Sequence, residues 1–243
     1  MRDCLFSLAL APARVQQAQP VQPAGRSQRI VGPAPRAYAS LVEPPPFLSG
    51  QLLLSMPGIG DDRFDRTVIA MCLHDDQGAL GLVINKPMPD LTLHGLLDQL
   101  DIAPGVAPDV PVLAGGPVEP GRGFVLHEAD YAAAGTIQVG QAWAFTSTLD
   151  ILHAIARGEG PRRWHMVLGY AGWGAGQLDG EMSQHGWHLA PGDAATVWDV
   201  AAERRWERAF ALTGVAVANL VATPGRALPI TNAFSLLPSG SRK

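Results

Sequence analysis

The apolar residues between positions 46 and 200 fall into short runs that glycine and proline interrupt. Short apolar runs bounded by turn-forming residues are typical of buried β-strands. We predict strands at residues 52–55, 67–73, 79–85, 110–114, 123–127, 136–139, 142–145, 164–168, 187–190 and 195–198. The polar segment 74–78 separates the second and third of these runs and favours a β-hairpin there.

Helical periodicity begins with a leucine-rich segment. Its apolar residues recur at the i, i+3, i+4, i+7 spacing of one helix face, which predicts a helix over residues 92–100 with Leu93, Leu96, Leu97 and Leu100 turned inward. The segment follows the predicted strands directly. We therefore expect this helix to lie against the sheet.

Three further helices are predicted downstream. Ser147 and Asp150 have the spacing of a capping box and predict the start of a helix that ends at Gly158. The other two helices are predicted at residues 177–184 and 201–212. Short strands interleaved with helices indicate a single mixed α/β (α+β) domain.

The expected domain covers residues 46–230. Residues 1–45 are rich in Ala, Pro, Gln and Arg without a sustained apolar period, so we predict a disordered extension. Three interpretations of this extension stay open: an inert segment or over-long start, a transit-type peptide, and a secretory signal. Residues 231–243 are predicted to form a flexible tail.

Charge is divided unevenly along the chain. The net charge is -4, but the first 45 residues hold five arginines against two acidic residues, which leaves 13 basic and 20 acidic side chains in the rest. Because DNA affinity depends on neutralising phosphates with Lys and Arg, an acidic body makes direct nucleic-acid binding an unfavoured function.

Cysteine content and hydropathy bear on the cellular compartment. The two cysteines, Cys4 and Cys72, form no disulfide framework or metal-type spacing, which fits a reducing compartment. Cys72 lies within an apolar run and is expected to be a small buried hydrophobe. No run approaches the 18 to 20 apolar residues of a membrane span. We expect a soluble, cytoplasmic protein that does not enter a membrane.

The densest motif is Gly-Tyr-Ala-Gly-Trp-Gly-Ala-Gly-Gln-Leu at residues 169–178, expected as a glycine-rich turn between a strand and a helix. Free N–H groups at such a helix start can hold an anion. The segment lacks the Lys-Ser/Thr ending of a P-loop and the spacing of a dinucleotide loop. Its aromatic residues therefore either pack as structure or line a ligand site.

Other polar corners have two interpretations each. Asn85 and Lys86 end a predicted strand and either meet an anionic ligand or are solvated. Gly115 and Gly116 either allow a close backbone approach or form a plain turn. His127 stands beside a carboxylate and is either an acid or base or a hydrogen-bonded structural histidine.

Metal and cofactor binding are not expected. His185 and His188 point to opposite faces if they share a strand, so they do not converge on an ion. The sequence contains no Gly-x-Ser-x-Gly elbow and no HExxH motif.

Four of these segments, in this order, resemble the YqgE/AlgH family over about residues 47–225. They are residues 48–57, residues 78–87, the pair 115–118 and 123–127, and residues 169–178 followed by Glu181 and Trp187. Two departures are mild: Asp179 stands where a glutamate is expected, and Gly180 interrupts the short helix. The resemblance implies a compact α/β fold with a bifurcated, barrel-like sheet flanked by helices. It also implies a cytosolic setting and no established reaction, although such proteins are sometimes described as transcriptional regulators.

Three functions follow as hypotheses. The favoured one is a non-enzymatic protein that binds a small anionic ligand or a partner protein in one hollow, lined by Asn85, Lys86, Gly115, Gly116, His127, Tyr170, Gly172, Trp173 and Gln177. The second is an enzyme that uses His127 with Glu128 or Glu181. The third is a DNA-binding regulator, which requires one basic face built from Arg162, Arg163, Arg204, Arg205 and Arg208.

Overall fold

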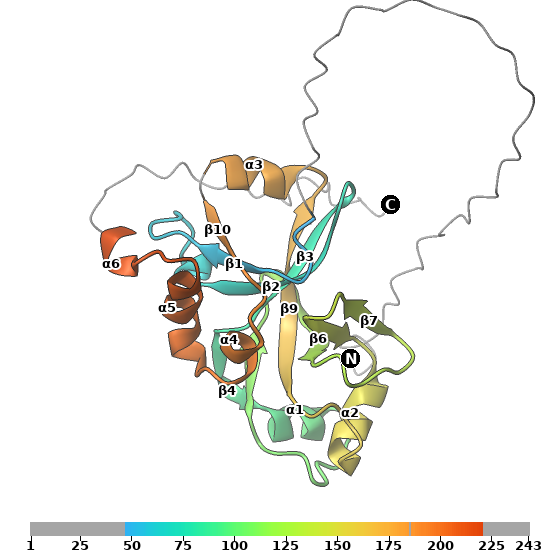
Figure 1. The fold of residues 1–243 in the computed structure, drawn as a ribbon. Helices are drawn as coiled ribbons and strands as arrows, with labels where there is room; N and C mark the ends of the chain where they lie inside the picture. Colours follow the sequence, from blue (N-terminus) through green and yellow to red (C-terminus); the bar gives the residue numbers. More distant parts are fainter. Residues whose placement is uncertain (1–46, 185, 221–243) are drawn as a thin grey trace, which may run out of the picture. The chain divides into compact units, whose positions relative to one another are not determined.

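The structure is a computed structural model that describes residues 47–184 and 186–220 (Figure 1). The predictions for residues 1–45 and 231–243 lie outside the described residues, as do both predicted boundaries of the domain. None of the described helices is long and apolar enough to span a bilayer.

The described residues form a sheet of ten strands flanked by helices. The strands are β1 (Leu52–Ser55), β2 (Val68–Asp75), β3 (Gly78–Val83), β4 (Pro87–Thr92), β5 (Pro111–Ala114), β6 (Val118–His127), β7 (Thr136–Val139), β8 (Trp143–Thr146), β9 (Trp164–Gly174) and β10 (Trp187–Ala190). The main path runs β10-β1-β2-β3-β9-β6-β8-β7, and β4 and β5 form a branch attached to β9. All pairings are antiparallel except that of β5 with β9.

The branch begins along one edge of β9. The end of this strand pairs with β3, from Ala171 to Gly174, whereas its earlier part pairs with β5 at Val167 and Leu168. The other edge of β9 pairs with β6. The sheet is therefore bifurcated, and β9 is common to both of its parts (Figure 1).

Glycines allow the backbones to approach closely at the fork. A Cβ atom at Gly115 would lie 2.3 Å from the carbonyl oxygen of Gly169, and one at Gly116 would lie 2.2 Å from the carbonyl carbon of Tyr170. Both separations are shorter than any normal contact. The Gly-Gly corner is thus required for the branch to join β9.

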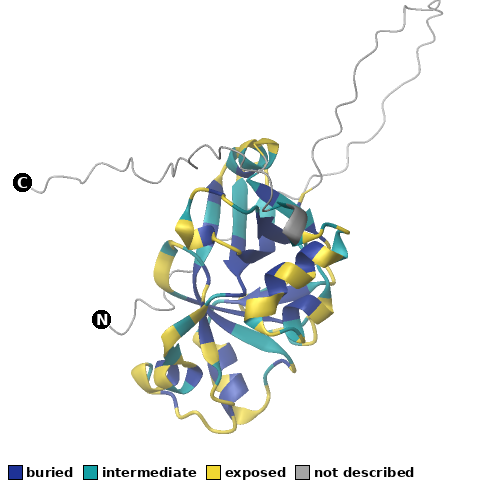
Figure 2. Cartoon of the chain, turned by 90° about the vertical axis from the view of Figure 1, so that its left-hand side faces the viewer, coloured by how far each residue is buried: buried dark blue, intermediate teal, exposed yellow. Residues whose placement is uncertain are grey.

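Helices cover the sheet on its different faces. They are the 3-10 turn η1 (Asp62–Phe64) and the α-helices α1 (Leu93–Gln99), α2 (Leu149–Arg157), α3 (Gln177–Ser183), α4 (Ala194–Trp198), α5 (Ala202–Leu212) and α6 (Val217–Leu220). Helices α1 and α2 pack on the branch side, and α5 and α3 pack on opposite faces of β1 and β2. Figure 2 shows the helices with exposed outer residues and buried inner ones.

Burial on both faces explains why β1 and β2 contain consecutive apolar residues, Leu52 to Leu54 and Val68 to Leu73. Leu52 and Leu54 lie in the core beneath α5, whereas Leu53, between them, lies in the core beneath α3. A strand buried on both faces has no polar positions to alternate with. Cys72 is 1% exposed in the α5 core, and its burial raises the pKa of the thiol.

The mixed α+β fold and most predicted elements are confirmed, including the hairpin between β2 and β3 and the helix at α1. Three local predictions are wrong. Residues 195–198 are helical because Asp193 caps α4, its Oδ2 accepting from the N–H of Thr196 at 2.8 Å. Ser147 does not cap α2, whose N-cap residue is Thr148. Residues 169–174 belong to β9 and form no turn.

Candidate functional site

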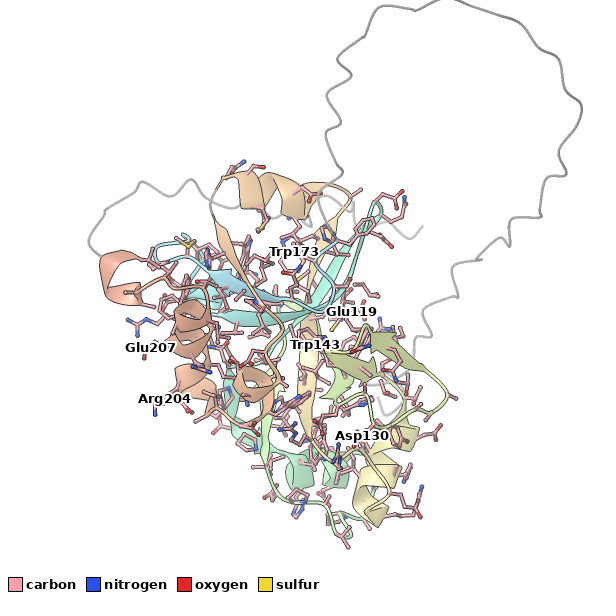
Figure 3. All side chains as sticks on the ribbon, viewed as in Figure 1. Glu119, Asp130, Trp143, Trp173, Arg204 and Glu207 are labelled. Carbon is pink, nitrogen blue, oxygen red and sulfur yellow. The ribbon has the colours of Figure 1, made fainter. Side chains whose placement is uncertain are left out.

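A small cleft opens where the end of β9 meets α3, β10 and η1. Its volume is about 120 Å³. It is lined by Arg63, Phe64, Pro117, Val118, Ala171, Gly172, Trp173, Gln177, Glu181 and Trp187. Figure 3 labels Trp173 at the end of the sheet that α3 covers.

Local structure presents the polar side chains to this cleft. Gly176 adopts a left-handed conformation with φ +67° and turns the chain from β9 into α3. Gln177 and Glu181 are four residues apart on α3, so they lie on the same helix face. Ala171 and Trp173 share one face of β9 and pack in the core beneath α3, whereas Tyr170 packs in the core on the other face.

The carboxylate of Glu181 accepts three hydrogen bonds from neutral donors. Its Oε2 accepts from Nε1 of Trp173 at 3.0 Å and from Nε1 of Trp187 at 2.8 Å. Its Oε1 accepts from Nε2 of Gln177 at 2.9 Å. Oε1 of Gln177 in turn accepts from the backbone N–H of Gly174 at 3.1 Å. These bonds fix the position of the carboxylate in the cleft.

Aromatic rings make up the floor of the cleft. Trp187 packs edge-to-face with Trp173, with ring centroids 5.9 Å apart, and with Phe64 at 5.4 Å. Trp173 and Trp187 are 7% and 4% exposed. Such mutually packed rings hold fixed positions, so the cleft is preformed.

Arg63 lies at the rim and is bound to a neighbouring acid. Its Nε donates to Oδ1 of Asp61 at 3.0 Å and its Nη2 to Oδ2 at 2.6 Å. These bonds from Arg63 lower the pKa of Asp61. The charge of the guanidinium is therefore balanced within the rim itself.

Of the nine residues predicted from the sequence, Gly172, Trp173 and Gln177 line the cleft. Asn85 and Lys86 do not. Asn85 is 7% exposed, and its side chain bonds the backbone N–H of Val68 and the carbonyl of Arg66, each at 2.8 Å. Nζ of Lys86 donates to the carbonyl oxygen of Asp65 at 2.5 Å. Both residues join the strand end to the loop before β2.

Gly115, Gly116 and Tyr170 also lie outside the cleft. The two glycines form the fork of the sheet, as described above. The hydroxyl of Tyr170 donates to Oε1 of Glu119 at 3.3 Å. Pro117 and Val118, which follow the two glycines, do line the cleft together with Gly172 and Trp173. Two of the three corners expected to share a hollow therefore contribute to the cleft, whereas the corner of Asn85 and Lys86 does not.

His127 lies at the opposite end of β9. It pairs with Trp164 at the start of that strand, whereas Trp173 lies near its end, a separation on the order of 30 Å along the strand. Figure 3 shows Trp173 near α3 and Asp130 near α2. The hypothesis of catalysis by His127 with Glu181 is incompatible with this separation.

Hydrogen bonds account for both ring nitrogens of His127. Nδ1 bonds the carbonyl of Glu128 at 2.7 Å and Nε2 bonds the hydroxyl of Thr146 at 3.0 Å. The residue is fully buried, and burial lowers its pKa. The carboxylate of Glu128 binds Arg163 at 2.5 Å. Both members of the second predicted acid-base pair, His127 and Glu128, are therefore engaged in structural bonds.

The predicted basic face is not assembled. Arg162 pairs with Asp130 at 2.8 Å, and Arg163 pairs with both Glu128 and Asp199. Arg205 is 5% exposed, and burial lowers its pKa to about 10. It donates to the carbonyl oxygens of Val200 and Ile84.

That leaves Arg204 and Arg208 exposed on α5, where Glu203 and Glu207 interleave with them. Figure 3 shows Arg204 and Glu207 both projecting outward from this helix. A surface with alternating charge has little attraction for phosphates.

No group of His, Cys, Asp or Glu side chains in the described residues is arranged to hold a metal ion. Nε2 of His188 bonds the hydroxyl of Thr213 at 3.0 Å, and its ring stacks on Phe210. His185, the other histidine considered for a metal site, lies outside the described residues.

Seven lining residues were not part of the predicted set: Arg63, Phe64, Pro117, Val118, Ala171, Glu181 and Trp187. The spacing of Gln177 and Glu181 is a local signal that would have identified Glu181. Arg63 and Phe64 come from the loop between β1 and β2, and no local pattern links that loop to α3.

The bifurcated sheet and its cleft define a mixed α+β protein with a preformed aromatic site. The AlgH-like family model matches residues 52–218, and the chain belongs to this family. A UPF0301 protein of Rhizorhabdus wittichii is 54% identical over 186 residues, covering 76% of this chain and 100% of that protein. A UPF0301 protein of Novosphingobium aromaticivorans is 51% identical over 181 residues, covering 74% and 97%.

Two solved structures are similar to this one. The solution structure of AlgH from Pseudomonas aeruginosa has a TM-score of 0.63 and 39% identity, covering 76% of this chain and 98% of that chain. A crystal structure of a Corynebacterium diphtheriae protein has a TM-score of 0.55 at 18% identity, covering 66% and 86%, and shows the fold alone. The similarity to AlgH agrees with the barrel-like, bifurcated sheet expected from the sequence.

Proposed function

We propose that this protein is a non-enzymatic binding protein that holds a small ligand in the cleft between β9, β10, α3 and η1. The observation that supports this most directly is the fixed carboxylate of Glu181, held by Trp173, Trp187 and Gln177 in an aromatic cleft. Concave, preformed sites with a few placed polar groups are typical of ligand binding.

The cleft volume limits what the ligand can be. At about 120 Å³ it is close to a cavity that holds one benzene ring, about 150 Å³. Drug-sized ligands and nucleotides need roughly 300 to 1,000 Å³. The bound group is therefore a small molecule or one side chain of a partner protein. A regulatory function of the protein would depend on the binding of this group.

The other two hypotheses have less support. Direct DNA binding needs free cations, but Arg162 and Arg163 are paired with carboxylates and Arg205 is buried. A regulatory effect on transcription would therefore act through a partner protein. An acid-base enzyme centred on His127 would have to use a ring whose nitrogens are both already bonded.

The proposal is tested with a panel of neutral, anionic and cationic fragments added to the full-length protein. The indole N–H resonances of Trp173 and Trp187 report on the cleft, and that of Trp198, which stacks on His165 elsewhere, is the internal control. We expect at least one fragment to shift the first two resonances saturably while leaving Trp198 unchanged. If no fragment shifts Trp173 or Trp187, the cleft is not a ligand site.

A further inference from the structure

Glu181 has no cationic partner among the described residues. Its three hydrogen-bond donors are neutral groups of Trp173, Trp187 and Gln177. Within residues 47–184 and 186–220, no Lys, Arg or His side chain forms an ion pair with it. An ionised carboxylate that is partly removed from water is unfavourable unless its charge is balanced. A ligand with a positive charge would supply that balance.

The acceptor oxygens in the cleft are not fully used. An oxygen of a carboxylate or amide accepts about two hydrogen bonds. Oε2 of Glu181 already accepts two, but its Oε1 accepts one, from Gln177, and Oε1 of Gln177 accepts one, from Gly174. Oε1 of Glu181 and Oε1 of Gln177 can therefore each accept one further hydrogen bond. The geometry thus favours a ligand that donates hydrogen bonds.

The rim does not offset the negative charge. The guanidinium of Arg63 is bound through two nitrogens to Asp61, so this pair contributes no net charge. Asp179, two residues before Glu181 on the same helix, does not line the cleft, and its Oδ1 lies 3.9 Å from Nε2 of His74. The anionic ligand expected from the sequence would therefore meet an unfavourable field.

The aromatic rings favour the same charge. Phe64, Trp173 and Trp187 all line the cleft, and the electron-rich faces of such rings attract cations. A volume of about 120 Å³ admits a cationic head group with a short stem. It is too small for a large amphiphilic molecule.

We propose that the ligand group is a hydrogen-bond-donating organic cation, a primary ammonium or guanidinium on a short apolar stem. This inference rests on the ligand-binding function proposed above. The N–H groups donate to Oε1 of Glu181 and Oε1 of Gln177, while the stem contacts the aromatic rings. A free small amine and the Lys or Arg side chain of a peptide share this chemistry.

The test compares four probes of similar size: n-butylammonium, n-butylguanidinium, neutral butanol and anionic butyrate. Binding to the full-length protein is followed by the indole N–H resonances of Trp173 and Trp187, assigned with Trp→Phe variants. We expect both cations to bind about ten-fold or more tightly than butanol or butyrate. The cations form a charged hydrogen bond to the carboxylate of Glu181, whereas butanol forms a neutral one and butyrate is repelled by the carboxylate. Acetylated Lys and Arg tripeptides test the peptide source against the free amines.

Substitutions test whether the negative charge of Glu181 is responsible for cation binding. Glu181→Gln keeps the shape of the side chain and removes its charge, and is expected to weaken cation binding about ten-fold or more. Asp98→Asn makes the same change of charge on α1, away from the cleft, and is expected to leave binding unaltered. If Glu181→Gln does not fold, Asp61→Asn at the rim releases the charge of Arg63 and is expected to weaken cation binding as well.

The outcomes separate the two proposals. Saturable shifts with butanol or butyrate but not with the cations would overturn the cation assignment and leave the ligand-binding function standing. Equal cation affinity in Glu181→Gln and the unmodified protein would also overturn it. No shift with any of the four probes, the peptides or the wider fragment panel would overturn both.

Discussion

Trp173 on β9 and Trp187 on β10 donate their indole N–H groups to the same oxygen atom, Oε2 of Glu181, at 3.0 and 2.8 Å. Three strands, β1, β2 and β3, separate β9 from β10 in the order of the sheet. The two indoles reach one atom because the sheet curls into a partial barrel, and α3 lies across its opening. The carboxylate of Glu181 thus connects β9 and β10, which lie at the two ends of the curled part of the sheet.

This relationship predicts the effect of Trp187→Phe. The substitution keeps an aromatic ring but removes the N–H donor and part of a side chain that is 4% exposed. We expect the free energy of unfolding to fall by about 1–3 kcal/mol, the usual cost of removing one partner of a buried polar interaction. Urea denaturation measures this change.

A double-mutant cycle tests whether this loss of stability comes from the hydrogen bond between Trp187 and Glu181. If the bond to Glu181 is responsible, Trp187→Phe costs less in a Glu181→Gln background than in the unmodified protein. Trp198→Phe, at a half-buried indole outside the cleft, is the control and should cost less than Trp187→Phe. Strictly additive effects in the cycle would contradict the coupling.

The fork of the sheet predicts a large effect of Gly115→Ala. The new Cβ atom would lie 2.3 Å from the carbonyl oxygen of Gly169, so the branch must move away from β9. We expect a loss of at least about 1–3 kcal/mol of stability, as for overpacked cores. Gly180→Ala is the matched control, since no atom lies within 4 Å of its Cβ position in α3.

In the control, replacing a helical glycine by alanine should raise stability by about 0.5–1 kcal/mol. Thermal unfolding of the two variants, measured side by side, gives opposite signs of the change in Tm. A Gly115→Ala protein as stable as the Gly180→Ala protein would mean that the fork is not tightly packed.

Local patterns predict this fold well where the element is defined by its own residues. Apolar runs bounded by turns identify β1, β2 and β3, and the leucine spacing identifies α1. Residues 169–174 are different because their glycines are typical of a turn, yet they form part of β9. Pairing with β3 and β6 determines their conformation, and that pairing is not visible in the local sequence.

The candidate site was predictable only in part for a related reason. Trp173 and Gln177 belong to one local cluster that also lines the cleft, so their grouping follows from the chain itself. Phe64 reaches the cleft through long-range packing on Trp187. Asn85 and His127 have the polar groups expected of a site, but backbone and hydroxyl partners already occupy them.

Burial of His165 predicts that stability depends on pH. Burial, followed by the charge of Arg205, lowers its pKa from 6.5 to about 4, while Nε2 bonds the carbonyl of Val197. The unfolded chain therefore binds a proton near pH 6.5 that the folded protein binds only near pH 4. The stabilisation is present above about pH 6.5 and is lost as the pH falls toward 4.

His165→Gln tests this dependence, since glutamine does not titrate and can still donate to Val197. Between pH 6.5 and 4 the free energy of unfolding should fall less steeply with decreasing pH in the variant than in the unmodified protein. The two slopes should differ by up to about 1.4 kcal/mol per pH unit, which corresponds to the uptake of one proton. Burial also lowers the pKa values of His127 and His188, but both proteins retain these residues, so their contributions cancel. Parallel stability curves would show that His165 titrates normally in the folded state.

The observed start of α4 and the predicted start of α2 lead to a final comparison of helix caps. Oδ2 of Asp193 accepts from the N–H of Thr196 at 2.8 Å and from its hydroxyl at 2.6 Å, so Asp193→Ala should cost about 1–2 kcal/mol. Ser147→Ala should cost less than about 0.5 kcal/mol, because α2 begins after Thr148 without a side-chain cap. Urea denaturation of both variants checks the difference. An equal loss in the two would mean that the capping-box pattern at Ser147 operates in solution, because the helix would then depend on that hydroxyl.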